Sequence, residues 1–404
     1  MTFHRLRGEP RVIKSITTPK RQLTKVYAVF ADALDRAQRN LREYETAIEA
    51  PIEAQRNLLR VLLEDYSGTQ YGEKHGLERS LSLDEYREKA PVVTYHDLRS
   101  LFEEIRHGDY TVLLKEDPIT WVMTRGTTGE NKIMPVTETH MDHLIRGGAR
   151  AVLNTAFKRG GLETLMGGVL NLQFPSNTSV MNTGGEDQGV GFSSGTYARL
   201  NPMMAGLGLV PRQEDIDALE TGLSFDDWEK RYEFIYQQAR DENIITIMGV
   251  APVQTAFARY LKKTHGVYPR DIWNMKVLYT TSVAKIHTKY KPRLQKMYGD
   301  VSVVEMYTAT EGAFGQQMDD YPYWRPNFDL YLFEVETGDG IKMLSELKRG
   351  EWGRLIISTP ILPRYKIGDL VEAMGKNYYR VFGRDKPRVV WEHRLYRLLF
   401  GWPL

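Results

Sequence analysis

Residues 124–132, with the sequence TRGTTGENK, combine small hydroxyl side chains and glycines with a lysine. Glycines let backbone amides approach an anion, threonine hydroxyls donate hydrogen bonds to it, and a lysine adds a point charge. These residue types point to a phosphate-binding loop. The spacing does not fit the Walker pattern, which requires four residues between its first glycine and a Gly-Lys pair, so a plain glycine-rich turn remains the alternative.

Later stretches supply groups that complement this loop. The stretch YTATEG contains Tyr307, Thr310 and Glu311, while YKIGDL and FGRD contain Asp369 and Arg384. A glutamate is a hard oxygen ligand suited to Mg²⁺, and an aspartate can accept hydrogen bonds from ribose hydroxyls. Taken alone, Glu311 would be interpreted as a surface carboxylate and Asp369 as an aspartate in a hairpin turn. Taken together, phosphate donors, a magnesium carboxylate, an aromatic ring and a ribose carboxylate are complementary parts of one ATP site.

Two other patterns suggest different chemistry. Residues 191–195, GFSSG, match the Gly-x-Ser-x-Gly elbow of serine hydrolases, with His265 or His287 as a candidate base. That elbow requires a buried strand before the serine, whereas the preceding residues read as a polar loop, which disfavours a hydrolase. His140 and His143 lie three residues apart on a predicted helix, but no third metal ligand is evident, so we interpret them as part of a solvated helix face.

The motifs stand where predicted strands end. Residues 119–123 predict a short strand before the glycine-threonine loop, and residues 138–157 predict a helix after it. Strands predicted at 244–248, 275–280 and 301–307 alternate with helices predicted at 227–242, 252–263 and 288–298. This alternation implies right-handed crossovers and a parallel sheet, where ligands gather at the carboxyl ends of the strands. Short strands at 355–358, 370–373 and 378–382 predict a small antiparallel sheet or barrel.

Composition limits the class of protein. The 404 residues are 42% hydrophobic and 26% charged, enough for one large domain or two with a sizeable core. The net charge of +2, spread along the chain, argues against nucleic acid or an acidic surface as the main partner. The absence of cysteine excludes disulfides and thiolate metal sites. Neither a membrane span nor a signal peptide is evident, so we expect a cytoplasmic protein without membrane partners.

The chain divides into three predicted parts. Residues 1–44 form a basic N-terminal arm that leads into a helix, residues 45–385 form a compact body, and residues 386–404 form an apolar and basic tail. The arm carries arginines and lysines against one acid within its first 25 residues, and a frayed tail is its ordinary interpretation.

The order of the motifs resembles that of the adenylate-forming enzymes, which combine a Ser/Thr/Gly loop with lysine, a Tyr-x-x-Thr-Glu motif and a Gly-Asp motif before Gly-Arg. The stretches APVVTYHDL, KIMPVT, MGVAP and YTATEGAFG narrow this resemblance to the Gretchen Hagen 3 family of acyl-acid amido synthetases. The resemblance covers residues 45–385. It implies an α/β adenylate-forming large domain with parallel α/β subdomains and a small antiparallel β-barrel-like part.

The resemblance also implies a role for each matched residue. Lys132, Thr310 and Glu311 would act in catalysis, and Glu311 would bind Mg²⁺. The residues that would bind ATP are Thr124, Gly126, Thr127, Thr128 and Gly129 at the phosphates, Tyr307 at adenine, Asp369 at ribose, and Phe382 and Arg384 near the nucleotide.

The implied reaction has two steps. A substrate carboxylate attacks the α-phosphorus to give an acyl-adenylate and pyrophosphate, and an amine or amino acid then attacks the adenylate to form an amide. Because the carboxylate is already a nucleophile, the site must chiefly neutralise phosphate charge and align the attack. A small-molecule carboxylic acid and an amino acid or amine are the implied partners.

Departures from the family pattern leave alternatives open. Arg125 stands where serine is usual and Thr281 where glycine is usual. The family continues past the Gly-Arg stretch into a C-terminal domain that contributes a lysine, and residues 386–404 would be only a stub of it. A catalytically impaired nucleotide- or acyl-binding homologue, or dependence on a separate protein that supplies the lid function, are therefore alternatives. A carboxylate-CoA ligase is a third, disfavoured by the KIMPVT and PVVTY segments.

Overall fold

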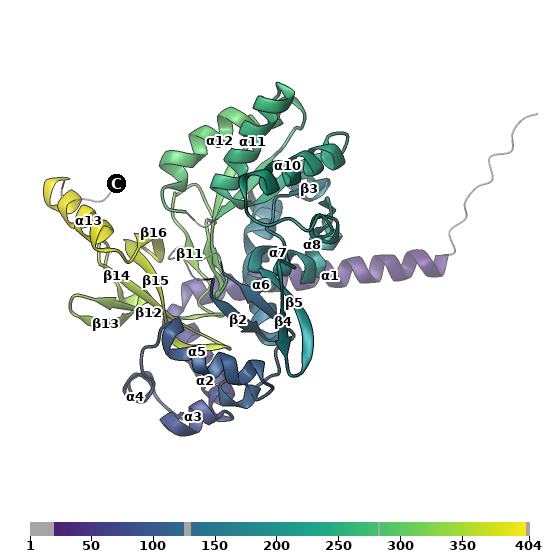
Figure 1. Cartoon of the computed structure of the whole chain (residues 1–404). Helices are drawn as coiled ribbons and strands as arrows, with labels where there is room; N and C mark the ends of the chain where they lie inside the picture. The colour runs from purple at the N-terminus through teal and green to yellow at the C-terminus, as the bar shows by residue number, and fades with distance from the viewer. Residues whose placement is uncertain (1–19, 125–130, 282, 401–404) are drawn as a thin grey trace, which may run out of the picture.

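The computed structural model describes residues 20–124, 131–281 and 283–400, with side chains described from residue 32 onward apart from Ala205 and Phe400. The N-terminal helices are α1 (Lys20–Glu49), α2 (Pro51–Ser67), α3 (Gln70–His75), α4 (Leu83–Lys89) and α5 (Tyr95–Arg106). Pro51 opens α2, as expected for a residue without a backbone N–H at the first helical position. The N-terminal half of α1 extends beyond the rest of the molecule (Figure 1).

A four-stranded sheet carries the glycine-threonine loop. Its strands are β1 (Thr120–Met123), β2 (Ile133–Val136), β4 (Ser179–Thr183) and β5 (Glu186–Phe192), in the order β2-β1-β5-β4. Strands β1 and β2 are antiparallel neighbours, and the end of β1 pairs in parallel with the end of β5. The predicted strand before the loop is therefore confirmed, and the loop connects β1 to β2.

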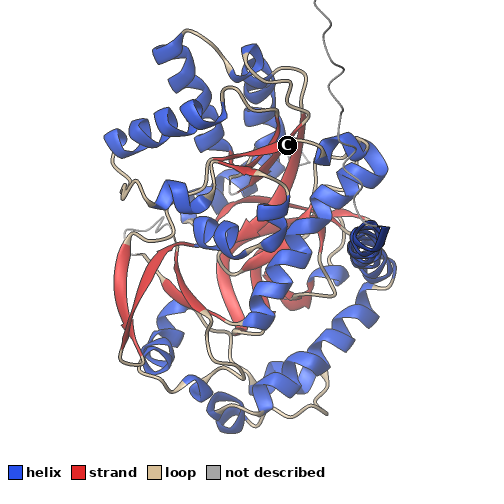
Figure 2. Cartoon of the chain, turned by 90° about the vertical axis from the view of Figure 1, so that its right-hand side faces the viewer, coloured by secondary structure: helices blue, strands red, loops and turns tan. Residues whose placement is uncertain are grey.

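A seven-stranded sheet forms the centre of the molecule, with helices packed around it (Figure 2). Its strands are β3 (Gly168–Asn171), β6 (Leu209–Val210), β7 (Ile244–Val250), β8 (Val277–Thr281), β9 (Ser302–Ala309), β10 (Gly312–Gln316) and β11 (Arg325–Pro326), in the order β11-β10-β9-β8-β7-β3-β6. Strands β6, β3, β7, β8 and β9 are parallel, which confirms the predicted parallel sheet. The nearly continuous burial of β7 explains its unbroken apolar sequence.

The helices of this region are α6 (Glu138–Asn154), α7 (Ser193–Leu200), α8 (Pro202–Gly206), α9 (Gln213–Asp217), α10 (Phe225–Ala239), α11 (Ala251–His265) and α12 (Lys291–Tyr298). A π-helical turn, Ile286–Tyr290, precedes α12. A capping box begins the predicted helix α10, because Ser224 accepts from the Asp227 N–H and Asp227 accepts from the Ser224 N–H. Helix α6 packs against β9 and β10.

A five-stranded antiparallel sheet follows, as predicted. Its strands are β12 (Leu332–Thr337), β13 (Gly340–Met343), β14 (Trp352–Thr359), β15 (Leu362–Gly375) and β16 (Tyr378–Arg384), in the order β13-β12-β14-β15-β16. Asp369 lies within β15 rather than in a turn, next to Gly368, whose φ of +87° is left-handed. Helix α13 (Pro387–Phe400) packs on this sheet through His393.

One large hydrophobic core joins these parts. It runs from the N-terminal helices through all three sheets. Within the described residues, none of the helices combines the length and apolarity needed to cross a membrane. The three sheets are thus held on a shared core, and residues far apart in sequence keep fixed relative positions.

Candidate active site

The ends of the glycine-threonine loop are fixed to each other. The backbone N–H of Thr124 donates to the carbonyl of Lys132 at 2.8 Å, and the N–H of Lys132 donates to the Thr124 hydroxyl at 3.2 Å. The predicted phosphate contacts Gly126, Thr127, Thr128 and Gly129, together with Arg125, lie outside the described residues. Thr124 and Lys132 therefore define where the loop leaves β1 and returns to β2.

Lys132 reaches from the four-stranded sheet to the antiparallel sheet. Its ammonium donates to the hydroxyl of Tyr365 at 3.1 Å and lies 5.4 Å from the ring centroid of Tyr95. Burial lowers the pKa of Lys132, and the negative charge of Glu311 partly opposes this shift. A half-buried ammonium with few partners can bind an anion strongly.

Thr310 and Glu311 occupy the tip of a tight hairpin between β9 and β10. Ala309 pairs with Gly312, so these two residues alone form the turn. The Thr310 hydroxyl shares a 2.9 Å hydrogen bond with the hydroxyl of Ser193, and its carbonyl accepts from Tyr197 at 2.8 Å. The turn thus stands at the N-terminus of α7.

Glu311 is a buried carboxylate, with 6% of its surface exposed. Burial raises its pKa, and the positive charge of Lys132 opposes this shift. Within the described residues, Glu311 forms no ion pair. A cation bound here would favour the ionised form of the carboxylate.

Asp369 joins β9 to the antiparallel sheet. One of its oxygens accepts from the hydroxyl of Tyr307 at 2.7 Å, and the other accepts from Arg384 at 2.9 Å. Arg384 also donates to the carbonyl of Ile367 at 3.0 Å. The structure therefore brings together three of the predicted nucleotide contacts, and each Asp369 oxygen keeps a lone pair for a further donor.

Phe382 packs against the C-terminal helix. Its ring stacks on His393 of α13, with ring centroids 4.0 Å apart, and meets the edge of Trp352 at 5.7 Å. Both aromatic partners of Phe382 lie outside the cluster formed by Tyr307, Asp369 and Arg384. Its assignment to the nucleotide stays a prediction.

The GFSSG stretch is preceded by a strand, so the predicted polar loop is wrong. Strand β5 ends in the buried residues Gly191 and Phe192, and Ser193 begins α7. The sequence misled because β5 begins with exposed polar residues in a hairpin with β4. The two glycines are required by packing: a Cβ would lie 2.1 Å from the backbone of Ser176 at Gly191, and 1.9 Å from the Phe174 carbonyl at Gly195.

The histidines suggested as a hydrolase base have other partners. His265 lies 2.7 Å from a carboxylate oxygen of Glu233, and His287 lies 3.0 Å from one of Glu305. Ser193 instead meets Thr310. The serine therefore belongs to the Thr310 turn, and the described contacts give no support to a hydrolase triad.

His140 is buried and His143 is partly buried, which corrects the predicted solvated helix face. Helix α6 is covered by β9 and β10, and His140 has no exposed surface. Burial lowers the pKa of His140 to about 3 and that of His143 to about 4, so both imidazoles are neutral at pH 7. Within the described residues, no group of three histidines or carboxylates could hold a metal ion.

Among the described residues, Glu311 fits a Mg²⁺ ion that is held chiefly by substrate phosphates. Mg²⁺ is often held by one or two carboxylates together with substrate phosphates, and Glu311 is a buried carboxylate beside Lys132.

Sequence reasoning missed four residues that contact the predicted ones: Tyr95, Ser193, Tyr197 and Tyr365. Tyr365 begins the YKIGDL stretch, but nothing local relates its hydroxyl to a lysine 233 positions away.

Comparison with known proteins confirms the predicted resemblance and fold. Residues 40–196 match the GH3 family N-terminal domain. The chain is 36% identical over 90 residues to the probable indole-3-acetic acid-amido synthetase GH3.2 of Oryza sativa subsp. japonica, covering 22% of this chain and 15% of the relative. It is 31% identical over 116 residues to the indole-3-acetic acid-amido synthetase GH3.2 of Arabidopsis thaliana, covering 28% of this chain and 21% of the relative. The matches thus span less than a quarter of these relatives.

Solved structures resemble a larger part of the chain. The AtGH3.15 acyl acid amido synthetase in complex with 2,4-DB matches with a TM-score of 0.70 and 15% identity, over 87% of this chain and 70% of that chain. An open 2-hydroxyisobutyryl-CoA ligase in complex with 2-HIB-AMP and CoA matches with a TM-score of 0.52 and 14% identity, over 81% and 74%. At these identities the matches establish that the chain shares the fold of these two enzymes, and nothing beyond the fold.

Proposed function

We propose that the protein uses ATP and Mg²⁺ to activate a carboxylic acid as an acyl-adenylate, because residues 40–196 match the GH3 family N-terminal domain. The acyl group then passes to the nitrogen of an amino acid or another amine. The relatives named as indole-3-acetic acid-amido synthetases support a carboxylic acid and an amino acid as substrate classes.

One observation carries this proposal: three distant segments bring complementary charges to one place. Lys132 follows the glycine-threonine loop, Glu311 lies at the β9–β10 turn, and Asp369 with Arg384 lies on the antiparallel sheet. The links are the Lys132–Tyr365 and Tyr307–Asp369 hydrogen bonds. A polyphosphate, a divalent cation and a ribose are the ligand groups that match lysine, buried glutamate and aspartate.

The first step in this proposal joins a carboxylate oxygen to the α-phosphorus, and the bond from that phosphorus to the pyrophosphate oxygen breaks. Lys132 neutralises phosphate charge, and Thr310 positions the α-phosphate at the turn. Glu311 would hold Mg²⁺, which supplies charge neutralisation at the phosphate oxygens when bound. Asp369 accepts hydrogen bonds from the ribose and so orients the nucleotide.

In the second step the amine nitrogen attacks the acyl carbon, the bond to the AMP oxygen breaks, and a proton leaves the nitrogen.

The proposed domain organisation has residues 45–385 as the large domain and residues 386–404 as the beginning of a further domain. We propose a cytoplasmic location for the protein. The comparisons give no support to a separate protein that supplies a lid.

Two other functions remain as outcomes of the test. A catalytically impaired homologue would bind ATP or an acyl group without turnover. A carboxylate-CoA ligase would transfer the acyl group to a thiol, and the fold similarity to 2-hydroxyisobutyryl-CoA ligase motivates this alternative.

The test is pyrophosphate release from ATP and Mg²⁺ by the purified protein with a panel of aryl and alkyl carboxylates, and with hydroxylamine to trap acyl-adenylate. We expect release with at least one acid, and a fall of about a hundredfold in Glu311→Ala, as for loss of a key charge stabiliser. ATP binding without release would identify the impaired homologue, and a requirement for coenzyme A would identify the ligase. Absence of ATP binding would overturn the proposal.

A further inference from the structure

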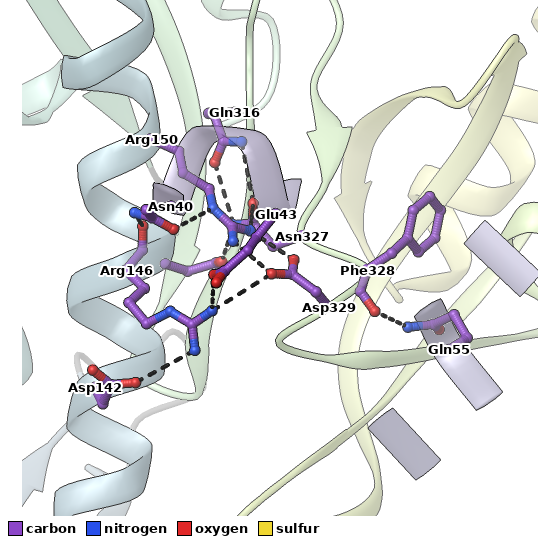
Figure 3. A network of polar contacts seen from close by, with 11 residues as sticks. Asn40, Glu43, Gln55, Asp142, Arg146, Arg150, Gln316, Asn327, Phe328 and Asp329 are labelled. Carbon is purple, nitrogen blue, oxygen red and sulfur yellow. Dashed lines mark hydrogen bonds and ion pairs between the residues drawn. The ribbon is translucent and has the colours of Figure 1, made fainter. Parts of the chain in front are cut away.

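A saturated polar network connects α1, α6, β10 and the residues that follow β11 (Figure 3). Its centre is Arg150 of α6, which is fully buried. The guanidinium donates to both oxygens of Asp329, at 2.8 and 2.6 Å, and to the side-chain oxygen of Asn327 at 2.9 Å. Its Nε donates to the side-chain oxygen of Asn40 on α1 at 3.0 Å. We call Arg150, Asn327, Asp329, Asn40 and Gln316 the Arg150 network.

Arg150 determines how the amide of Asn327 is oriented. A guanidinium can only donate hydrogen bonds, so the oxygen of Asn327 must face Arg150 and its NH₂ group must face the other way. That NH₂ group donates to the carbonyl of Ala313 at 2.6 Å and to Gln316 at 3.2 Å. If the amide had the opposite orientation, the side-chain oxygen of Asn327 would face the carbonyl oxygen of Ala313 across the same 2.6 Å.

The peptide groups of Ala313 are held from both sides. Its carbonyl accepts from Asn327, and its N–H donates to the hydroxyl of Tyr331 at 3.1 Å. Two glycines near Ala313 are also closely packed. A Cβ at Gly312 would lie 2.7 Å from the Tyr331 ring, and a Cβ at Gly147 of α6 would lie 2.8 Å from the Ala313 carbonyl oxygen. The start of β10 therefore has little freedom to move.

The fixed residue is two positions from Glu311. Because Ala309 pairs with Gly312 and Thr308 with Ala313, the turn has only two residues between paired strand ends. A displacement of Ala313 would thus be transmitted directly to Glu311 through Gly312. This effect does not require any side chain of the Arg150 network to contact a nucleotide.

We infer that Asn327, oriented by Arg150, and Tyr331 are positioning residues that hold Glu311 where it binds Mg²⁺ with ATP. This inference rests on the proposed function. It assigns to Asn327 and Tyr331, which hold the two peptide groups of Ala313, a role in the metal requirement of the reaction. Networks in which every group is satisfied are well suited to fix a unique geometry.

Asn327→Asp tests the inference with nearly unchanged shape. The aspartate keeps an acceptor for Arg150 but replaces the donor to the Ala313 carbonyl with a second oxygen. Pyrophosphate release is measured against Mg²⁺ concentration, together with kcat, the KM for ATP and the melting temperature. We expect the half-saturating Mg²⁺ concentration to rise about tenfold, the equivalent of one buried hydrogen bond, with recovery of rate at high Mg²⁺.

Two further variants separate positioning from stability. Tyr331→Phe removes only the hydroxyl that accepts from Ala313, and we expect a rise of about threefold in half-saturating Mg²⁺. Asn40→Ala is the matched control, because it removes a hydrogen bond to Arg150 on the side away from Ala313. It should lower the melting temperature and leave the Mg²⁺ requirement unchanged. If Asn327→Asp fails to fold, Tyr331→Phe and Asn40→Ala still make the comparison.

The inference is overturned if wild-type protein turns over and Tyr331→Phe and any folded Asn327→Asp keep its Mg²⁺ requirement. It is also overturned if Asn40→Ala shifts that requirement as much as they do, because the effect would then follow general stability. A wild-type protein that releases no pyrophosphate would instead refute the proposed function on which the inference rests.

Discussion

Two buried sets of charges in this molecule are satisfied to different degrees. In the Arg150 network, the guanidinium has hydrogen-bond partners on three sides and a carboxylate that binds it through both oxygens. In the candidate site, the ammonium of Lys132 donates to one described side chain, the Tyr365 hydroxyl, and Glu311 forms no ion pair with a described residue. The comparison indicates that the network holds the architecture, whereas the site has capacity for a ligand.

The largest predicted effect would come from breaking the saturated network. Arg150→Met removes the bidentate partner of the part-buried Asp329, which keeps only a 3.8 Å contact with Arg146. We expect a loss of about 3 kcal/mol in the free energy of unfolding, at the lower end for breaking a buried ion pair. Urea denaturation measures this loss. The double variant Arg150→Met with Asp329→Leu should recover most of it, since removing both charges is far less costly than removing one. A single variant within about 1 kcal/mol of wild type would show that the network is not the stabilising cluster described here.

A smaller effect concerns the histidines of α6, which packs against the site turn on β9 and β10. Folding lowers the pKa of His140 from 6.5 to about 3 and that of His143 to about 4, mainly through burial. The unfolded chain therefore binds protons below pH 6.5 that the folded chain does not bind, so stability falls as the pH decreases from 6.5 toward 4. Between pH 6.5 and pH 5 we expect a loss of roughly 2 kcal/mol for each histidine.

Urea denaturation at pH 7 and pH 5 checks this prediction. His140→Leu should reduce the difference between the two pH values by about half. His96→Gln, at an exposed position, serves as the control. An unchanged pH dependence in His140→Leu would contradict the assignment of a neutral buried imidazole.

The smallest effect concerns Asp369, the carboxylate proposed to hold the ribose. Asp369→Asn keeps the shape and an acceptor for Arg384 but removes the negative charge. We expect the affinity for ATP to fall about tenfold, the effect of weakening hydrogen bonds to a charged group. Asp385→Asn is the matched control, because Asp385 pairs with Arg354 at 2.7 Å. Equal effects of both variants on ATP affinity would remove the distinction that the site assignment requires.

The sequence predicted those features that depend on local patterns. The helix α10 and the apolar strand β7 are determined by neighbouring residues, and both are confirmed. The motif residues were found because each stands at the end of a strand or beside a glycine. The family resemblance then placed Glu311 and Asp369 in one site.

Features that depend on distant partners were not predictable in this way. Arg150 in a helix suggests a solvent-exposed side chain, and only the tertiary structure buries it against Asn327 and Asp329. His140 was misplaced for the same reason, since α6 is covered on the face that carries it. The length of β15 was also missed, because Gly368 interrupts the strand pattern where the register between β14 and β15 shifts.

The most direct test of the central claim is calorimetric titration of ATP into the wild-type protein and Glu311→Gln, each with and without Mg²⁺. Glutamine keeps the size of the side chain and removes its charge. If Glu311 holds the metal, wild type will bind ATP more tightly with Mg²⁺, and Glu311→Gln will lose that difference while still binding ATP through Lys132 and Asp369. An identical Mg²⁺ dependence in the two proteins, or no ATP binding by wild type, would contradict the account.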